Sequence, residues 1–297
     1  MTKVVEVKQL TKTFGKFKAL DKVDLSVNQG AIHGFIGPNG SGKSTTIRTL
    51  LGMLKADSGE IKLFGKDAWY DAVDIHQRIA YVPGEANLWP NLSGGQVIDM
   101  LLKMRGGKIN LARRDELIER FELDPTKKCR TYSKGNRQKV VLIAAFSADA
   151  DLYILDEPTS GLDPLMERLF QELVFEAKSN GKSVLLSSHI LSEVERLCDS
   201  VSIIRKGQII ENGTLDDLRH LTRNKLTVET AESITGLDQL QGVYDLVEKD
   251  GNHYEMQVAN DKLDSLMKHI SLFGVRKLES HPPTLEDLFM HHYEGGR

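Results

Sequence analysis

The segment from Gly37 to Ser44, Gly-Pro-Asn-Gly-Ser-Gly-Lys-Ser, constrains the fold of this chain more than any other feature. It matches the phosphate-binding pattern of glycine, any four residues, then Gly-Lys-Ser/Thr. An apolar strand is expected before it, at 31–36, and a helix after it, from about 43 to 54. Glycines let the backbone wrap closely around an anion, and the amides at a helix N-terminus point toward it. The segment therefore predicts a nucleotide phosphate site on a strand–loop–helix unit.

Two side chains of this loop carry chemistry of their own. Lys43 is expected to reach the β- and γ-phosphates and to neutralise charge during catalysis, and Ser44 to offer its hydroxyl to Mg²⁺. The residues of the loop expected to bind the nucleotide are Gly37, Pro38, Asn39, Gly40, Ser41, Gly42, Lys43, Ser44 and Thr45. The loop alone does not distinguish kinases, GTPases and transport ATPases.

Size and composition narrow the class of protein. A chain of 297 residues suits one large α/β domain with a smaller one. No apolar run approaches the roughly 20 residues that span a bilayer, so a membrane role requires a partner chain. A net charge of −3 without a basic block argues against a nucleic-acid partner. The isolated Cys129 and Cys198 fit a reducing compartment, and a cytoplasmic protein is expected.

The hydrophobic pattern divides the chain into regions. Alternating apolar residues up to about residue 35 predict antiparallel strands, and strands alternating with helices then predict a mostly parallel, covered sheet. A helical pattern over about 88–148 interrupts this rhythm and indicates an inserted subdomain. Near residue 222 the pattern becomes that of a small α+β domain, with a last helix expected from Thr284. The predicted domains are therefore 1–221 and 222–297.

A second acidic element completes the nucleotide site. The predicted strand 152–155 ends in Asp156 and Glu157, followed by Pro158. An acid at the end of a buried strand beside the phosphate strand can hold Mg²⁺, here Asp156. The adjacent Glu157 is then placed to polarise an attacking water.

The string Asp-Glu-Pro-Thr-Ser-Gly-Leu-Asp over 156–163, together with the phosphate loop, resembles the ATP-binding cassette (ABC) ATPases, the motor subunits of ABC transporters. The resemblance implies an α/β P-loop NTPase with an antiparallel β subdomain and an inserted helical subdomain. It implies that Glu157 is the catalytic glutamate and that His189 is the switch histidine on the γ-phosphate. It also implies that Phe14 lies against the adenine and that Asp163 belongs to a loop that crosses to a second subunit.

The family's signature sequence occurs letter for letter at Leu92–Gln96, but this position is too early in the chain. The signature should lead into the helix before the strand that carries Glu157. Residues 132–136, Tyr-Ser-Lys-Gly-Asn, fit that place, so Ser133 and Gly135 are expected to face the γ-phosphate held by another subunit. We interpret Leu92–Gln96 as a helix cap in which Ser93 supplies the hydroxyl.

A second departure affects the metal site. The family normally has a glutamine after the strand that ends near Val82, and this sequence has Gly84 there, with Glu85 next. Because glycine has no side chain to bind metal, either Glu85 or a water would have to replace the glutamine. We expect this change to weaken the coupling to the metal and to leave the loop mainly as a docking surface.

The resemblance implies ATP and Mg²⁺ as cofactors, a homodimer, and an integral membrane permease as partner, on the inner face of the cell membrane. The signature at 132–136 and the ending Pro282–Phe289 are typical of bacterial exporter ATPases with separate permeases. A drug or another toxic hydrophobic compound is the expected cargo. The alternatives are a non-transport ABC ATPase and a nucleotide-dependent regulator without a membrane partner. A permease that purifies with the chain would separate them.

Overall fold

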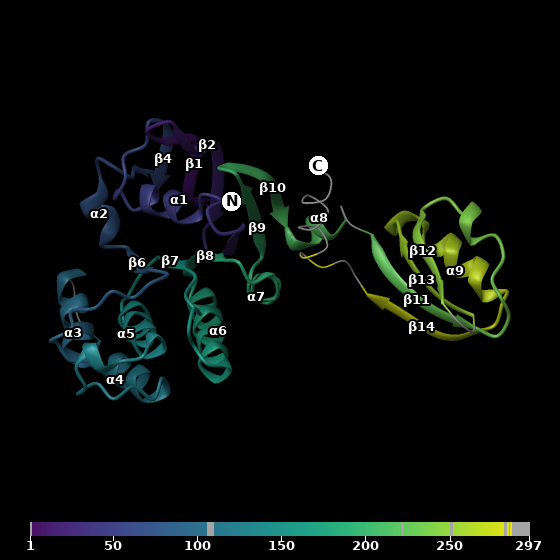
Figure 1. The fold of residues 1–297 in the computed structure, drawn as a ribbon. Coiled ribbons are helices and arrows are strands. Elements are labelled where there is room, and N and C mark those ends of the chain that lie inside the picture. Colours follow the sequence, from purple (N-terminus) through teal and green to yellow (C-terminus); the bar gives the residue numbers. More distant parts are fainter. Residues whose placement is uncertain are drawn as a thin grey trace. The chain divides into compact units, whose positions relative to one another are not determined.

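The computed structural model describes residues 2–105, 110–220, 223–249 and 252–281, together with Thr284 and Glu286. It divides into two compact units, Met1–Gly213 and Thr214–Arg297 (Figure 1). The domain boundary predicted at 221/222 differs slightly from this division, which groups helix α8 (Leu215–His220) with the second unit.

An antiparallel sheet of order β2-β1-β4-β5 opens the first unit. Its strands are β1 (Lys3–Phe14), β2 (Phe17–Asn28), β4 (Ser58–Leu63) and β5 (Lys66–Asp67). Four apolar residues of β1 (Val4, Val5, Val7 and Leu10) are buried and the rest of the strand is partly or fully exposed, as expected for a sheet with one covered face. The antiparallel strands predicted before the phosphate loop are therefore confirmed.

A six-stranded sheet of order β10-β9-β3-β8-β7-β6 carries the phosphate loop. Its strands are β3 (Ile32–Ile36), β6 (Ile79–Val82), β7 (Leu152–Asp156), β8 (Ser183–Ser188), β9 (Ser200–Arg205) and β10 (Gln208–Thr214). Strands β6, β7, β8, β3 and β9 run parallel in that order, and every residue of β3, β7 and β8 is buried. Their carboxyl ends therefore meet at one edge of the sheet. Strand β10 was not predicted from the sequence.

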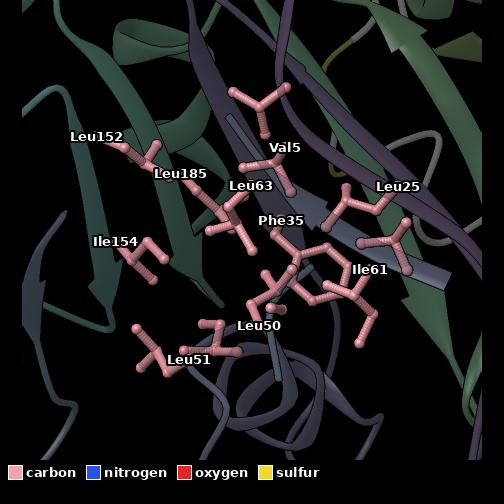
Figure 2. Close-up of a cluster of buried hydrophobic side chains, with 14 of the residues drawn as sticks. Val5, Leu25, Phe35, Leu50, Leu51, Ile61, Leu63, Leu152, Ile154 and Leu185 are labelled. Atoms are coloured by element: carbon pink, nitrogen blue, oxygen red, sulfur yellow. The ribbon is translucent and has the colours of Figure 1, made fainter. Parts of the chain in front are cut away.

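One hydrophobic core joins the two sheets around helix α1 (Lys43–Leu50). Figure 2 shows Phe35 of β3 beside Leu50 of α1, with Leu63 of β4 and Leu185 of β8 in the same cluster. The helix ends at Leu50 rather than near residue 54, and Gly52, with a φ of 64°, follows it. This packing fixes the direction in which α1 leaves the phosphate loop.

Helices fill the remainder of the first unit. The predicted helical stretch contains α3 (Gly94–Arg105), α4 (Leu111–Arg120), a 3₁₀ turn (Cys129–Thr131) and α5 (Lys134–Phe146), which lie together in Figure 1. The others are α2 (Ala72–His76), α6 (Pro164–Ser179) and α7 (Leu191–Leu197). Among the described residues, no helix has the length and apolar character needed to cross a bilayer.

The second unit is an α+β fold. Its antiparallel sheet has the order β12-β13-β11-β14, with β11 (Asn224–Thr230), β12 (Val243–Lys249), β13 (His253–Val258) and β14 (Val275–His281). Two 3₁₀ turns (Leu237–Gln239 and Asn260–Lys262) and helix α9 (Leu263–Ser271) complete it. Leu266 and Ile270 of α9 pack on Val228 and Tyr254 of the sheet. Apart from Thr284 and Glu286, the predicted last helix lies outside the described residues.

Candidate nucleotide site

The phosphate loop connects β3 to α1 in a conformation that requires glycine. Gly42 precedes α1 with a φ of 118°, and Gly40 has a φ of 78°. A Cβ atom at Gly37 would lie 2.2 Å from the carbonyl oxygen of Ile204, so only glycine fits this close approach. The hydroxyl of Ser41 is buried without a hydrogen-bond partner among the described residues. The loop thus packs closely against the sheet, and the Ser41 hydroxyl remains available for a hydrogen bond.

Lys43 lies folded against its own loop. Its Nζ donates to the carbonyl oxygens of Gly37, at 2.6 Å, and Pro38, at 3.3 Å, and the residue is only 5% exposed. Burial lowers the pKa of Lys43, and the carboxylates of Glu157 and Asp156 oppose this shift. The ammonium group therefore depends on nearby negative charge, which an anion bound in the loop would supply.

The acidic pair lies at the carboxyl end of β7, beside the loop. The hydroxyl of Ser187, on β8, donates to Oδ1 of the buried Asp156. Glu157 has a φ of 46°, in the left-handed region that is unusual for residues with a side chain, and its amide donates to the Ser187 carbonyl at 3.0 Å. The two successive carboxylates therefore have different surroundings, because Asp156 bonds Ser187 whereas Glu157 lies near Lys43.

Three sequence-predicted catalytic residues come together at this edge of the sheet. Oε1 of Glu157 lies 3.6 Å from Nζ of Lys43, and Oε2 of Glu157 lies 3.3 Å from Nδ1 of His189. The His189 side chain is half exposed. The Glu157 carboxylate thus lies between a cation and an imidazole that come from different loops.

The donor set at the strand edge fits Mg²⁺ bound through a nucleotide. Ser44 and Asp156 offer one hydroxyl and one carboxylate, and the described residues contain no cluster of three histidine, cysteine or acidic side chains. Mg²⁺ commonly takes few protein ligands and completes its coordination with waters and phosphate oxygens. The site therefore suits a magnesium–nucleotide complex better than a metal held by the protein alone.

Ser133 and Gly135 belong to the first turn of α5. Ser133 is the N-cap, and its hydroxyl accepts from the Asn136 amide at 3.2 Å. A Cβ atom at Gly135 would lie 2.4 Å from the carbonyl oxygen of Gly161, and Lys134 donates to the hydroxyl of Ser160 at 2.7 Å. This turn is therefore packed on the loop that follows Glu157.

Asp163 begins a helix, and Phe14 is exposed at the end of a strand. Asp163 is the N-cap of α6 and accepts from the amides of Leu165, at 3.1 Å, and Met166, at 3.0 Å. Phe14, at the end of β1, is exposed, and Nζ of Lys12 lies 5.6 Å from the centre of its ring. An exposed ring at this position is available to stack on a base.

The string Leu92–Gln96 is a helix start, as interpreted from the sequence. The Gln96 amide donates to the Ser93 hydroxyl at 3.3 Å, and the Ser93 amide donates to the Gln96 side chain at 2.9 Å. These reciprocal bonds form a capping box at the start of α3. The prediction of a cap is confirmed, although the helix already begins at Gly94.

Two residues next to the site were missed by sequence reasoning. Gln138, which is buried, donates to the carbonyl of Pro158 at 3.1 Å and so ties α5 to the loop after Glu157. The Ser187 hydroxyl donates to Asp156. In the sequence, the one indication that Ser187 lies at the site is its position two residues before His189. Gly84 lies against the turn formed by Asp156 and Glu157, since a Cβ atom at Gly84 would lie 3.2 Å from the Asp156 carbonyl. Glu85, beside it, is exposed.

Comparisons with known proteins agree with this geometry. Residues 20–160 match the family model of the ABC transporter, and residues 213–293 match the C-terminal domain of DrrA1-3-like ATP-binding proteins. The chain is 33% identical to the bacitracin transport ATP-binding protein BcrA of Bacillus licheniformis, over 100% of this chain and 99% of BcrA. It is also 33% identical to the daunorubicin resistance ATP-binding protein DrrA3 of Streptomyces coeruleorubidus, over 94% of this chain and 92% of DrrA3.

A solved ATP-binding subunit of an ABC transporter superposes with a TM-score of 0.70 and 33% identity, over 73% of this chain and 92% of that structure. The phosphate loop, the acidic strand end and the full-length relatives all lead to the same assignment. The chain belongs to the ABC transporter family, as one of its ATP-binding ATPase subunits.

Proposed function

We propose that this chain is the ATP-hydrolysing motor of an exporter whose membrane permease is a separate polypeptide. The observation that carries the proposal is the convergence of Lys43, Glu157 and His189 at one edge of the parallel sheet. Phosphoryl transfer to water needs mainly positioning and charge neutralisation, and this cluster can supply both.

In this proposal each side chain has a separate task. Lys43 exchanges its loop carbonyls and Glu157 for the phosphates of ATP, and Glu157, once released, orients the attacking water. His189 donates to the γ-phosphate. Ser44 and Asp156 would hold Mg²⁺, which when bound would supply positive charge against the charge that develops on the phosphates.

A second copy of the chain would complete each site. Within the described residues, the Ser133 hydroxyl accepts from Asn136 of its own helix and the Lys134 ammonium donates to Ser160 of the loop after Glu157, so neither side chain bonds the phosphate loop of the same chain. In a head-to-tail dimer, Ser133 and the amides near Gly135 would cover the γ-phosphate held by the other copy. Closure around ATP and opening after hydrolysis would then be the movement passed to a partner.

The permease is proposed to dock at residues 87–104, beside the loop of Gly84. Trp89 and Met104 are 47% and 73% exposed there, and large exposed apolar side chains mark contact surfaces. This placement would hold the chain on the inner face of the cell membrane. The names of BcrA and DrrA3 refer to bacitracin and daunorubicin, which supports a toxic hydrophobic compound as cargo.

The proposal is tested with the full chain purified together with any membrane protein that co-purifies with it. We expect magnesium-dependent ATP hydrolysis that export substrates stimulate and that Glu157→Gln abolishes. ATP hydrolysis without a membrane partner would favour a non-transport ABC ATPase. Nucleotide binding without turnover would favour a nucleotide-dependent regulator.

A further inference from the structure

The last two residues of β8 face opposite sides of the sheet, because side chains alternate along a strand. The hydroxyl of Ser187 donates to the magnesium-site candidate Asp156. The hydroxyl of Ser188 donates to Oε2 of Glu193, on α7, at 2.7 Å. The first contact belongs to the site already described, whereas the second reaches a carboxyl group that has no role in it.

Glu193 is an acidic residue in a buried position. It is only 7% exposed, and its Oε1 has no hydrogen-bond partner among the described residues. Burial raises the pKa of Glu193, as does the charge of Glu167 on α6, while the hydroxyls of Ser188 and Thr159 and the nearby His189 oppose the rise. A buried, half-satisfied carboxyl group costs stability, so its presence requires a compensating contribution.

Ser188 connects the Glu193 carboxyl group to the loop that carries His189. The Ser188 hydroxyl gives its single hydrogen to Glu193 and accepts from the Ile190 amide at 3.0 Å. Residues 188 and 190 flank His189, so this relay restrains the backbone on both sides of the imidazole.

We propose that Glu193 is a positioning residue for His189: through Ser188 and the Ile190 amide, its buried carboxyl group holds the histidine loop so that the imidazole stays beside Glu157. This inference rests on the proposed function, in which His189 contacts the γ-phosphate. Glu193 itself touches no reacting atom and acts only through the loop.

The test is steady-state ATP hydrolysis by the full chain with its permease. Glu193→Ala and Ser188→Ala should each lower kcat by about 10-fold or more, because small misplacements of a positioned group are costly. The KM for ATP should change less than about 2-fold, since the phosphate loop is untouched. Glu193→Gln retains an oxygen for Ser188 and should recover most of the lost kcat. Ser192→Ala, at an exposed position of the same helix, is the matched control.

The His189→Ala background separates positioning from general stability. There, adding Glu193→Ala should cause no further loss of kcat, and a second full loss would overturn the proposal. Equal losses of kcat in Glu193→Gln and Glu193→Ala would also overturn the proposal. A shift of the His189 ring resonance in Ser188→Ala, measured by NMR without ATP, is the readout independent of turnover. If the wild-type protein hydrolyses no ATP, the proposed function is wrong. If the His189 ring resonance is the same in Ser188→Ala as in the wild type, only the positioning role is wrong.

Discussion

Nζ of Lys43 lies 3.6 Å from Oε1 of Glu157, so the lysine of the phosphate loop and the carboxylate at the end of β7 form an ion pair. The pair compensates part of the cost of burying Lys43, whose pKa burial lowers. The triphosphate of ATP carries more negative charge than one carboxylate, so it competes effectively for the ammonium. Binding of ATP would thereby release Glu157 for the attacking water.

Lys43→Met should weaken ATP binding by roughly 10- to 100-fold, because charge-assisted hydrogen bonds contribute about 1.5–3 kcal/mol. The measurement is titration with a fluorescent ATP analogue. Lys55→Met is the control, since Lys55 lies over the ring of Trp69 and is absent from the site. Unchanged affinity in Lys43→Met would contradict the assigned role.

Glu157→Gln should bind ATP at least as tightly as the wild type while kcat falls by about 100-fold or more. The amide keeps the shape of the side chain and removes its ability to accept a proton. Because its ATP stays bound, the variant should accumulate as a closed dimer, which size-exclusion chromatography with ATP would detect. Normal turnover in this variant would exclude Glu157 as the catalytic base.

Ser133→Arg should abolish ATP hydrolysis, whereas Ser93→Ala should only lower the free energy of unfolding, by about 1 kcal/mol for a lost helix cap. The two serines occupy similar local positions, each at the N-cap of a helix. Urea unfolding and ATPase assays on both variants distinguish them. Loss of turnover in Ser93→Ala with Ser133→Arg still active would reverse the assignment of the signature.

His33 should make the first unit less stable in acid. Burial lowers its pKa to about 4, and its ring nitrogens contact the hydroxyls of Ser200, at 2.8 Å, and Ser202, at 2.9 Å. Because the folded pKa is below the unfolded value of about 6.5, this contribution is fully present above pH 6.5 and is lost as the pH falls toward 4. The largest loss is about 3 kcal/mol.

The measurement is the free energy of urea unfolding between pH 7 and pH 4. In His33→Gln the dependence on pH should be shallower over this window, although the variant is less stable at pH 7. Parallel curves for wild type and His33→Gln would contradict the prediction.

Local sequence alone was enough to locate the phosphate loop, the acidic strand end and the helix cap at Ser93. Each depends on a few neighbouring residues whose backbone geometry is set by glycine, by strand burial or by a reciprocal side-chain bond. The family resemblance added the candidate roles of His189 and Ser133. The sequence could not indicate the left-handed φ of Glu157 or the length of α1, because packing against other elements sets both.

Only the tertiary structure decided which of these residues meet. Glu157 directly follows β7 and His189 directly follows β8, and the parallel register of these two strands brings their ends side by side. The same register turns Ser187 toward Asp156 and leaves Ser188 for Glu193, a contact that no local pattern predicts. Short-range preferences thus identify the groups that can do chemistry, whereas long-range strand pairing sets the distances between them.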